Sequence, residues 1–351
     1  MNLYNHYEEM VKDDSCLYYD SPLGSVEYTR DFILGYFKSG EKQKIIILKL
    51  LDYLSQNRLQ HMVSAFLLGV YLYDKLEILH DAIDKLSEQL EQSVIWPTEK
   101  VPESARKCFL YLWFITCLYH DMGYIFEDMP LESCLCCDEF ISGILTRDEL
   151  ESFKGPFNHK DRIPEELAKN AGTYFVNGLE KNIRDKKCID HGIAAGVLLY
   201  KEMGKLHTVD PVVQENKSKL WVGKPILKNH IEHCAWCIIC HNIWCYSEDN
   251  VNMVKLYNER EIGLSELIFK GKNRFIKLNE HPLLFLLCLV DTIEPVKRSN
   301  WDYLKRMSIE IADDKIIINN HPSSKLNLDF ILPEYNKKDD SGNFEINLKT
   351  Y

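Results

Sequence analysis

The sequence predicts a predominantly helical protein that ends in a small β appendage. Over most of the 351 residues, apolar side chains recur at spacings of three and four, the period of one buried helix face. After residue 300 the period changes to two, which is typical of half-buried strands joined by turns. The chain contains no internal repeat and no low-complexity segment, so a repeat array is not expected.

The helical spacing covers much of the chain. It predicts helices at residues 26–37, 42–53, 58–73, 82–92, 103–121, 165–179, 191–203, 226–243 and 282–293. Polar and proline-containing stretches around residues 96–97 and at 205–224 are interpreted as loops within one domain.

The C-terminal region has the alternating pattern of strands. Apolar residues alternate with polar ones at 309–311, 316–318 and 344–348, with turn residues at 313–314 and 341–342 between them. We therefore divide the chain into an N-terminal helical extension packed on the core (1–50), a central helical domain (51–300) and the β appendage (301–351).

Composition limits the class of protein. A hydrophobic fraction of 46% is enough for a sizeable core. The net charge of -11 argues against an extended nucleic-acid surface, although a local basic pocket stays compatible with it.

The sequence has neither a signal-peptide pattern nor an apolar run long enough for a membrane span, so we expect a cytoplasmic protein without a membrane partner. The 12 cysteines lie mostly in apolar helical runs, which predicts reduced, packed thiols.

The dipeptide His-Asp occurs twice, in different surroundings. His80-Asp81 lies in a charged amphipathic run, where solvated side chains are expected. His120-Asp121 ends the apolar run CFLYLWFITCLYHD, which predicts deep burial. A buried ionisable pair needs a partner such as a metal ion. Adjacent helical residues point about 100° apart, so the other ligands must come from distant segments.

Four further segments each place a histidine or an aspartate, residue types that bind metals, beside an apolar helix face. These residues are His61, His191, His241 and Asp291. Each one alone is more often a core histidine bonded to a carbonyl, or an aspartate that caps a helix. Together with His120-Asp121, they make five segments with one pattern, which favours a shared metal site.

This order of residues resembles the HD superfamily of metal-dependent phosphohydrolases, over roughly residues 55 to 300. The resemblance implies an all-α HD-domain helical bundle that holds two divalent metal ions. One ion would bind His61, His120, Asp121 and Asp291. Asp121 would also bridge to a second ion held by His191 and His241. Imidazole and carboxylate ligands accommodate Mn, Fe, Mg, Zn, Ni or Co and do not choose among them.

The resemblance implies hydrolysis of a phosphate monoester or diester, through a hydroxide formed from water between two ions. The substrate would be a phosphorylated small molecule or a nucleotide. Two other classes stay open: a di-iron oxygenase with the same ligand order, and a nucleotide-binding protein without turnover. The oligomeric state is open as well, and an oligomer is compatible with the sequence.

The motif departs from one branch of the family. The cyclic-dinucleotide branch with a GYP signature has HDxGK, whereas this chain reads HDMGY, with Tyr124 at the lysine position and no GYP stretch after His191. We do not assign the chain to that branch. Tyr124 either donates a hydrogen bond to substrate or packs beneath the site.

Basic residues near the ligands are candidates for phosphate contacts. Arg58, one helical turn before His61, is preferred, whereas solvation at the surface is expected for Lys297 and Arg298. With Asp121 and Tyr124, Arg58 completes the set of candidate catalytic residues.

The cysteines suggest a competing metal site. Cys134, Cys136, Cys137 and the pair Cys234 and Cys237 have zinc-like spacing, but the pair lies inside the helix that leads to His241, which favours packing. On the same helix, His230 and His233 either orient a metal ligand or belong to the core.

Overall fold

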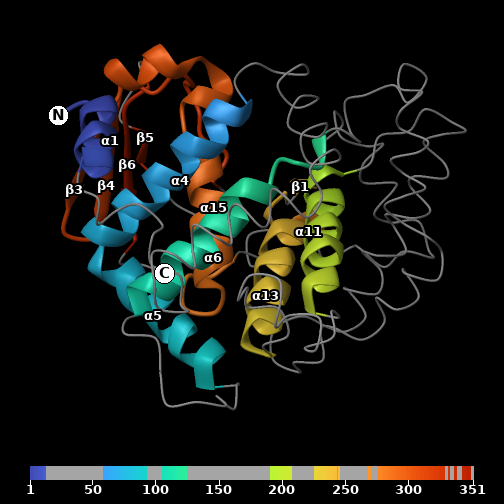
Figure 1. Cartoon of the computed structure of the whole chain (residues 1–351). Coiled ribbons are helices and arrows are strands. Elements are labelled where there is room, and N and C mark those ends of the chain that lie inside the picture. The colour runs from blue at the N-terminus through green and yellow to red at the C-terminus, as the bar shows by residue number, and fades with distance from the viewer. Residues whose placement is uncertain are drawn as a thin grey trace, which may run out of the picture.

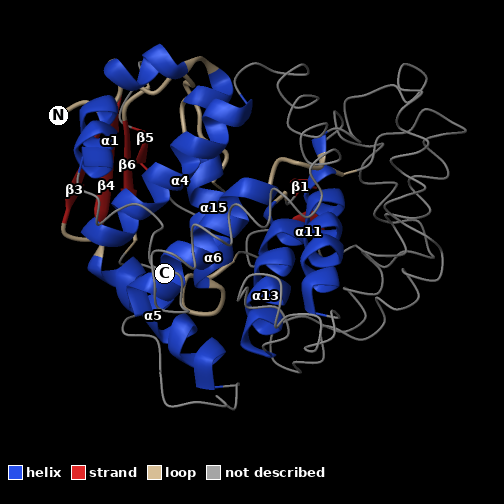
Figure 2. Ribbon diagram, viewed as in Figure 1, coloured by secondary structure: helices blue, strands red, loops and turns tan. Residues whose placement is uncertain are grey.

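The computed structural model describes residues 1–12, 58–92, 105–124, 190–207, 225–242, 244–245, 268–269, 276–328, 331–332, 336–337 and 342–348. Helices dominate these residues, and a small sheet lies at one side of the helical core (Figures 1 and 2). This agrees with the predicted helical protein that ends in a β appendage.

Six helices form the core that carries the candidate site. They are α4 (Arg58–Lys75), α5 (Glu77–Gln92), α6 (Ala105–Tyr119), α11 (His191–His207), α13 (Pro225–His241) and α15 (Pro282–Ile293). Helices α6 and α15 each contact α4, α5 and α13, and α11 runs beside α13 on the side away from α4 (Figure 1).

Helix α15 is the most apolar element of the core. Every one of its residues is buried except Asp291, whose side chain is 20% exposed. A helix that is hydrophobic on all sides is stable only inside a protein, because no face is suited to water. The one charged residue of this helix is therefore also its one partly exposed residue.

Helices α11 and α13 approach each other closely. A Cβ atom on Gly192 would lie 2.9 Å from the carbonyl oxygen of Ile238 and 3.0 Å from the His241 ring. Such separations are too short for real side-chain contacts, so glycine permits this approach. It brings the start of α11, with His191, beside the end of α13, with His241.

The β appendage is a four-stranded antiparallel sheet of order β3-β4-β6-β5. Its strands are β3 (Ser308–Ala312), β4 (Lys315–Asn319), β5 (Asn336–Lys337) and β6 (Phe344–Asn347). Ile316 pairs with Ile346 and Ile318 pairs with Phe344, and all four side chains are buried. In the turn between β3 and β4, Asp313 has a φ of 54°, a conformation that Asp tolerates better than most residues. A separate parallel pair joins β1 (Trp244–Cys245) to β2 (Ile268–Phe269).

A short N-terminal helix, α1 (Leu3–Lys12), ties the sheet to the helical core. The backbone N–H of Leu3 donates to the carbonyl of Met307 at 2.9 Å. The Tyr7 hydroxyl donates to the carbonyl of Ser64 in α4 at 3.0 Å. Between α15 and the sheet, the chain passes through two 3-10 turns, η6 (Val296–Arg298) and η7 (Trp301–Lys305).

The predicted elements agree with the structure in kind and differ at several ends. The helix expected at 103–121 ends at Tyr119, so His120 and Asp121 lie in the turn that follows it. The helix expected from residue 82 begins at Glu77, and α1 and β5 were not predicted. The helices expected at 26–37, 42–53 and 165–179 lie outside the described residues.

Two further expectations concern the cysteines and the membrane. Cys117, Cys234, Cys237, Cys240 and Cys288 are buried free thiols, as expected. Within the described ranges, no helix combines the length and the apolar character that a bilayer crossing requires.

Candidate metal centre

Five segments that are distant in sequence deliver their polar residues to one place. His61 lies in the first turn of α4, and His120 and Asp121 lie in the turn after α6. The others lie near helix ends, and they are His191 at the start of α11, His241 at the end of α13 and Asp291 in the last turn of α15. The ligand atoms of these residues form two groups, each within 4.8 Å: His61, His120, Asp121 and Asp291, and Asp121, His191 and His241.

The first group has the spacing of ligands around one ion. The Nε2 atom of His61 lies 3.1 Å from Nε2 of His120 and 3.1 Å from Oδ1 of Asp291. Nε2 of His120 lies 3.4 Å from Oδ1 of Asp121. Two ligand atoms about 2.1 Å from a metal and about 90–110° apart are separated by about 3.0–3.4 Å. The four side chains therefore fit one cation with little movement.

The second group shares Asp121 with the first. Nε2 of His191 lies 3.9 Å from Oδ1 of Asp121, and the rings of His191 and His241 lie 5.2 Å apart in an edge-on arrangement. The Asp121 carboxylate thus belongs to both groups.

Two atoms at the junction lack hydrogen bonds within the described structure. Oδ1 of Asp121 and Nε2 of His241 are buried and have no hydrogen-bond partner there. Leaving a buried polar atom unsatisfied costs about 1–3 kcal/mol, more for a charged group. Both atoms can bind a cation, so the donor set fits a metal at this point.

Hydrogen bonds at Nδ1 turn the imidazoles toward the centre. Nδ1 of His120 lies 2.9 Å from the carbonyl of Cys117, and Nδ1 of His241 lies 2.7 Å from that of Ile238. A carbonyl can only accept, so in both rings Nδ1 carries a proton and Nε2 is the nitrogen that remains for a metal. Nε2 of His120 lies among the other candidate ligand atoms, as metal coordination requires.

Glu294 is the hydrogen-bond partner that orients the imidazole of His61. Its Oε2 atom lies 2.6 Å from Nδ1 of His61 and accepts the backbone N–H of Lys297 at 3.0 Å. Its Oε1 atom accepts the N–H of Val296 at 2.8 Å. Glu294 is fully buried. Sequence reasoning missed this residue, although a carboxylate three positions after Asp291 in an apolar stretch was an available signal.

The pKa values of the histidines separate into two kinds. Burial lowers the pKa of His191 to about 4 and that of His241 to about 3, so both are neutral and able to bind a metal at neutral pH. Burial also lowers the pKa of His61, but its hydrogen bonds to Asp291 and Glu294 outweigh burial and raise the pKa to about 9. A metal at the first group would therefore displace a proton from His61.

Both aspartates stay ionised despite their burial. Burial alone would raise the pKa of Asp121, but Lys297, His120 and His61 together hold it well below its usual range. Lys297 and hydrogen bonds from His120 and His61 have the same effect on the pKa of Asp291.

Tyr124 packs against a metal-ligand candidate. Its ring stacks on His191 with a centroid distance of 3.7 Å and an interplanar angle of 14°. The Arg58 guanidinium carbon lies 3.1 Å from the centroid of the Tyr124 ring. Burial raises the pKa of Tyr124, so its hydroxyl stays protonated. These contacts are those of a packed aromatic ring, and donation of a hydrogen bond to substrate stays a prediction.

The three basic candidates have different hydrogen-bond partners in the structure. Nη1 of Arg58 lies 3.3 Å from Oδ2 of Asp121, so this residue lies beside the ligand groups, and its contact with a phosphate stays a prediction. Nζ of Lys297 lies 2.7 and 2.9 Å from the two Asp291 oxygens, so the expectation that Lys297 is solvated at the surface is wrong. Arg298 is exposed and donates to the carbonyl of Thr292 at 2.7 Å instead.

Gly123 fixes the turn that carries His120 and Asp121. A Cβ atom at this position would clash with the backbone carbonyl of His191. Only glycine lets the turn pass this close to the start of α11, which keeps Asp121 within reach of His191.

The competing sites do not form in the part of the chain that the structure describes. The side chains of His80 and Asp81 are 43% and 62% exposed, as expected for a dipeptide in a charged amphipathic run. No described cysteine belongs to either ligand group, and Cys134, Cys136 and Cys137 lie outside the described residues.

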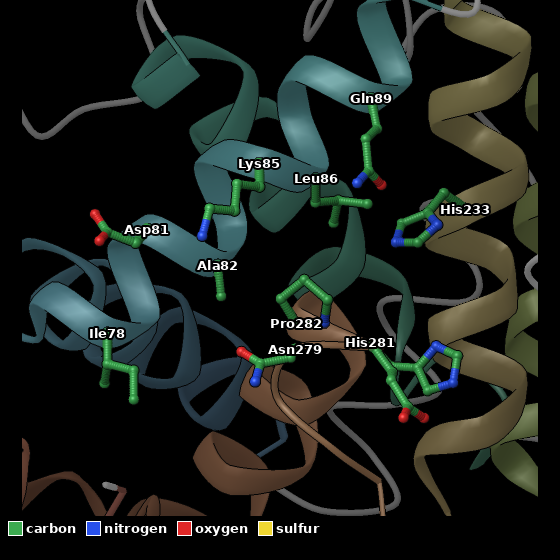
Figure 3. A pocket seen from close by; sticks show the side chains of 11 residues that line it. Ile78, Asp81, Ala82, Lys85, Leu86, Gln89, His233, Asn279, His281 and Pro282 are labelled. Carbon is green, nitrogen blue, oxygen red and sulfur yellow. The ribbon is translucent and has the colours of Figure 1, made fainter.

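His233 belongs to neither ligand group. It lines a hollow of about 440 Å³ between α5, α13 and the start of α15 (Figure 3). None of the residues around this hollow belongs to the two ligand groups.

Comparisons with known proteins return no relative. No protein-family model, no curated protein sequence and no solved structure matches this chain.

Replacing the shared ligand should empty both groups. We expect Asp121→Ala to bring the metal-to-protein ratio close to zero, because each group loses a ligand and the centre keeps the positive charge of Lys297. Metal analysis after equilibrium dialysis measures this, with circular dichroism to verify that the helical content is kept. Asp81→Ala is the matched control in the exposed dipeptide and should bind metal as the wild type does. Unchanged metal content in Asp121→Ala would show that the groups are not the metal site.

Glu294 should support metal binding without touching the ion. We expect Glu294→Ala to weaken metal binding by about 10–100-fold, the usual effect of removing the hydrogen-bond partner of a ligating histidine. Glu294→Gln should lose less metal affinity, because the glutamine carbonyl can still accept the Nδ1–H of His61. Titration with Mn²⁺ measures both, and Glu310→Gln, at an exposed strand position, is the control. Wild-type affinity in both Glu294 variants would refute the role.

Proposed function

We propose that this protein is a metal-dependent phosphohydrolase of the HD type, which cleaves a phosphate ester of a small molecule or nucleotide at a dinuclear centre. The observation that carries the proposal is the shared carboxylate. Asp121 faces one group with His61, His120 and Asp291 and a second with His191 and His241. The same residues, in the same sequence order, underlie the resemblance to the HD superfamily.

The chemistry of the proposed centre suits phosphate esters. Two divalent ions at such a centre lower the pKa of a water molecule and neutralise charge on the phosphoryl group. The chain contributes neutral imidazoles at His191 and His241, ionised carboxylates at Asp121 and Asp291, and cations at Arg58 and Lys297. The cations lie beside the carboxylates and can bind the phosphate oxygens.

The reaction is a balanced hydrolysis. The oxygen of water forms a new bond to phosphorus, and the bond between phosphorus and the ester oxygen breaks. One proton of the water goes to the leaving alcohol, and the other remains on the product phosphate. No oxidant or reductant takes part.

The activity can be tested with a panel of phosphate monoesters and diesters, each assayed with one divalent metal at a time under anaerobic conditions. We expect release of phosphate or of the alcohol with at least one of Mn²⁺, Mg²⁺, Zn²⁺, Ni²⁺, Co²⁺ and Fe²⁺, and loss of the activity in Asp121→Ala. In a parallel aerobic assay, iron-dependent oxygen uptake without ester cleavage would contradict the proposal, as would nucleotide binding without turnover by any metal form.

The second group distinguishes a dinuclear from a mononuclear centre. We expect His191→Ala and His241→Ala each to lower the metal-to-protein ratio from about two toward one and to reduce the rate by orders of magnitude, because one of the two activating ions is lost. Bound metal and melting temperature should be measured on the same samples. A lower melting temperature with an unchanged ratio would show that these histidines are structural and that the two-metal version is wrong.

A further inference from the structure

Among the described residues of the centre, some side chains are buried and others are partly exposed. The side chains of His61, His120 and Asp121 are fully buried, and those of His191 and His241 are nearly so. The exposed fractions are 20% for Asp291, 21% for Lys297 and 15% for Arg58. These three side chains and the partly exposed Tyr124 are therefore the described residues of the centre that a substrate can reach first.

Lys297 is anchored at this opening by the metal-ligand candidates themselves. Its Nζ atom lies 2.7 Å from Oδ1 and 2.9 Å from Oδ2 of Asp291, and 3.9 Å from Oδ1 of Asp121. An ammonium group has three N–H donors, and its partial exposure leaves room for an acceptor from outside.

Arg58 supplies a second cation on the same rim. Its guanidinium covers the Tyr124 ring at 3.1 Å and contacts Oδ2 of Asp121, while Nζ of Lys297 lies 5.9 Å from the centroid of that ring. The two cations thus flank one aromatic ring at the opening. The two cations come from different elements, because Arg58 is the first residue of α4 and Lys297 belongs to η6.

We propose that the substrates are phosphate monoesters bound as dianions, and that Lys297 binds an unesterified phosphate oxygen. This inference rests on the proposed hydrolase function and narrows it. Two side-chain cations, added to two divalent ions, outweigh the charges of Asp121, Asp291 and Glu294. The excess positive charge suits a dianion better than the monoanion of a diester.

The number of phosphate oxygens leads to the same preference. A monoester has three unesterified oxygens, and a diester has two. If the two ions bound one oxygen each, the third oxygen of a monoester would remain for a hydrogen-bond donor at the opening. Lys297 is such a donor, and a diester would carry its second alcohol group at that position instead.

Equilibrium binding of inorganic phosphate tests the role of Lys297 without any turnover. In metal-loaded protein at pH 8, where phosphate is mostly a dianion, we expect Lys297→Met to weaken phosphate binding by about 10–100-fold, the usual loss for a hydrogen bond to a charged group. Lys297→Arg should lose less phosphate affinity, because arginine keeps the positive charge. Arg298→Met removes the neighbouring cation, which bonds to Thr292 instead, and should bind phosphate like the wild type.

Metal content should be measured on the same samples. Weaker phosphate binding with two ions retained supports the inference. Unchanged phosphate affinity in Lys297→Met would overturn it. Loss of metal from Lys297→Met at the same metal concentration would overturn it as well, because Lys297 would then support the metal site and not the substrate.

A pair of substrates with one leaving group tests the substrate class. We expect the kcat/KM for 4-nitrophenyl phosphate to exceed that for bis(4-nitrophenyl) phosphate, and Lys297→Met to reduce the first far more than the second. Preference for the diester would overturn this inference and leave the hydrolase function standing. Phosphate binding through Lys297 with no hydrolysis of any ester would contradict the hydrolase function instead.

Discussion

Asp121 is a carboxylate that the fold has withdrawn from water, and the arrangement around it depends on keeping it charged. Burial of an ion costs several kcal/mol even after the protein relaxes, so an ionised Asp121 needs cationic or hydrogen-bonding neighbours. Arg58 and His61 lie beside its Oδ2 atom. Lys297, His120 and His191 lie beside its Oδ1 atom. The hydrogen bonds that satisfy the rest of the centre leave Oδ1 of Asp121 and Nε2 of His241 for a cation.

Helix ends solve the problem of placing so many polar groups in an apolar core. The last carbonyls of a helix have no partner within the helix. In α6 and α13, His120 and His241 donate to the carbonyls of Cys117 and Ile238, so one hydrogen bond both satisfies the helix end and orients the imidazole. At the start of α11, Asp190 accepts the N–H of Ile193 and caps the helix next to His191. The polar centre is therefore built from groups that the helices must satisfy in any case.

The sequence was informative where a polar residue interrupts an apolar run. His61, His120, Asp121, His191, His241 and Asp291 all stand out in this way, and the structure brings all six together. The sequence could not decide between Lys297 and Arg298, because neighbours in a 3-10 turn point in different directions and only the packing of η6 determines which one faces Asp291. Glu294 escaped notice because its role depends on a contact with His61, 233 positions away. The helix α1 was missed because it is short, and its burial depends on the sheet and on α4.

In the proposed centre, the Asp121 carboxylate is the shared ligand of two metal ions. A crystal structure of the protein grown with Mn²⁺, with data collected at a wavelength where manganese scatters anomalously, tests this most directly. We predict two anomalous peaks on opposite sides of Asp121. One should lie within about 2.0–2.2 Å of ligand atoms of His61, His120 and Asp291, and the other at the same distance from those of His191 and His241. Ordered manganese bound elsewhere, with no peak beside Asp121, would contradict the account.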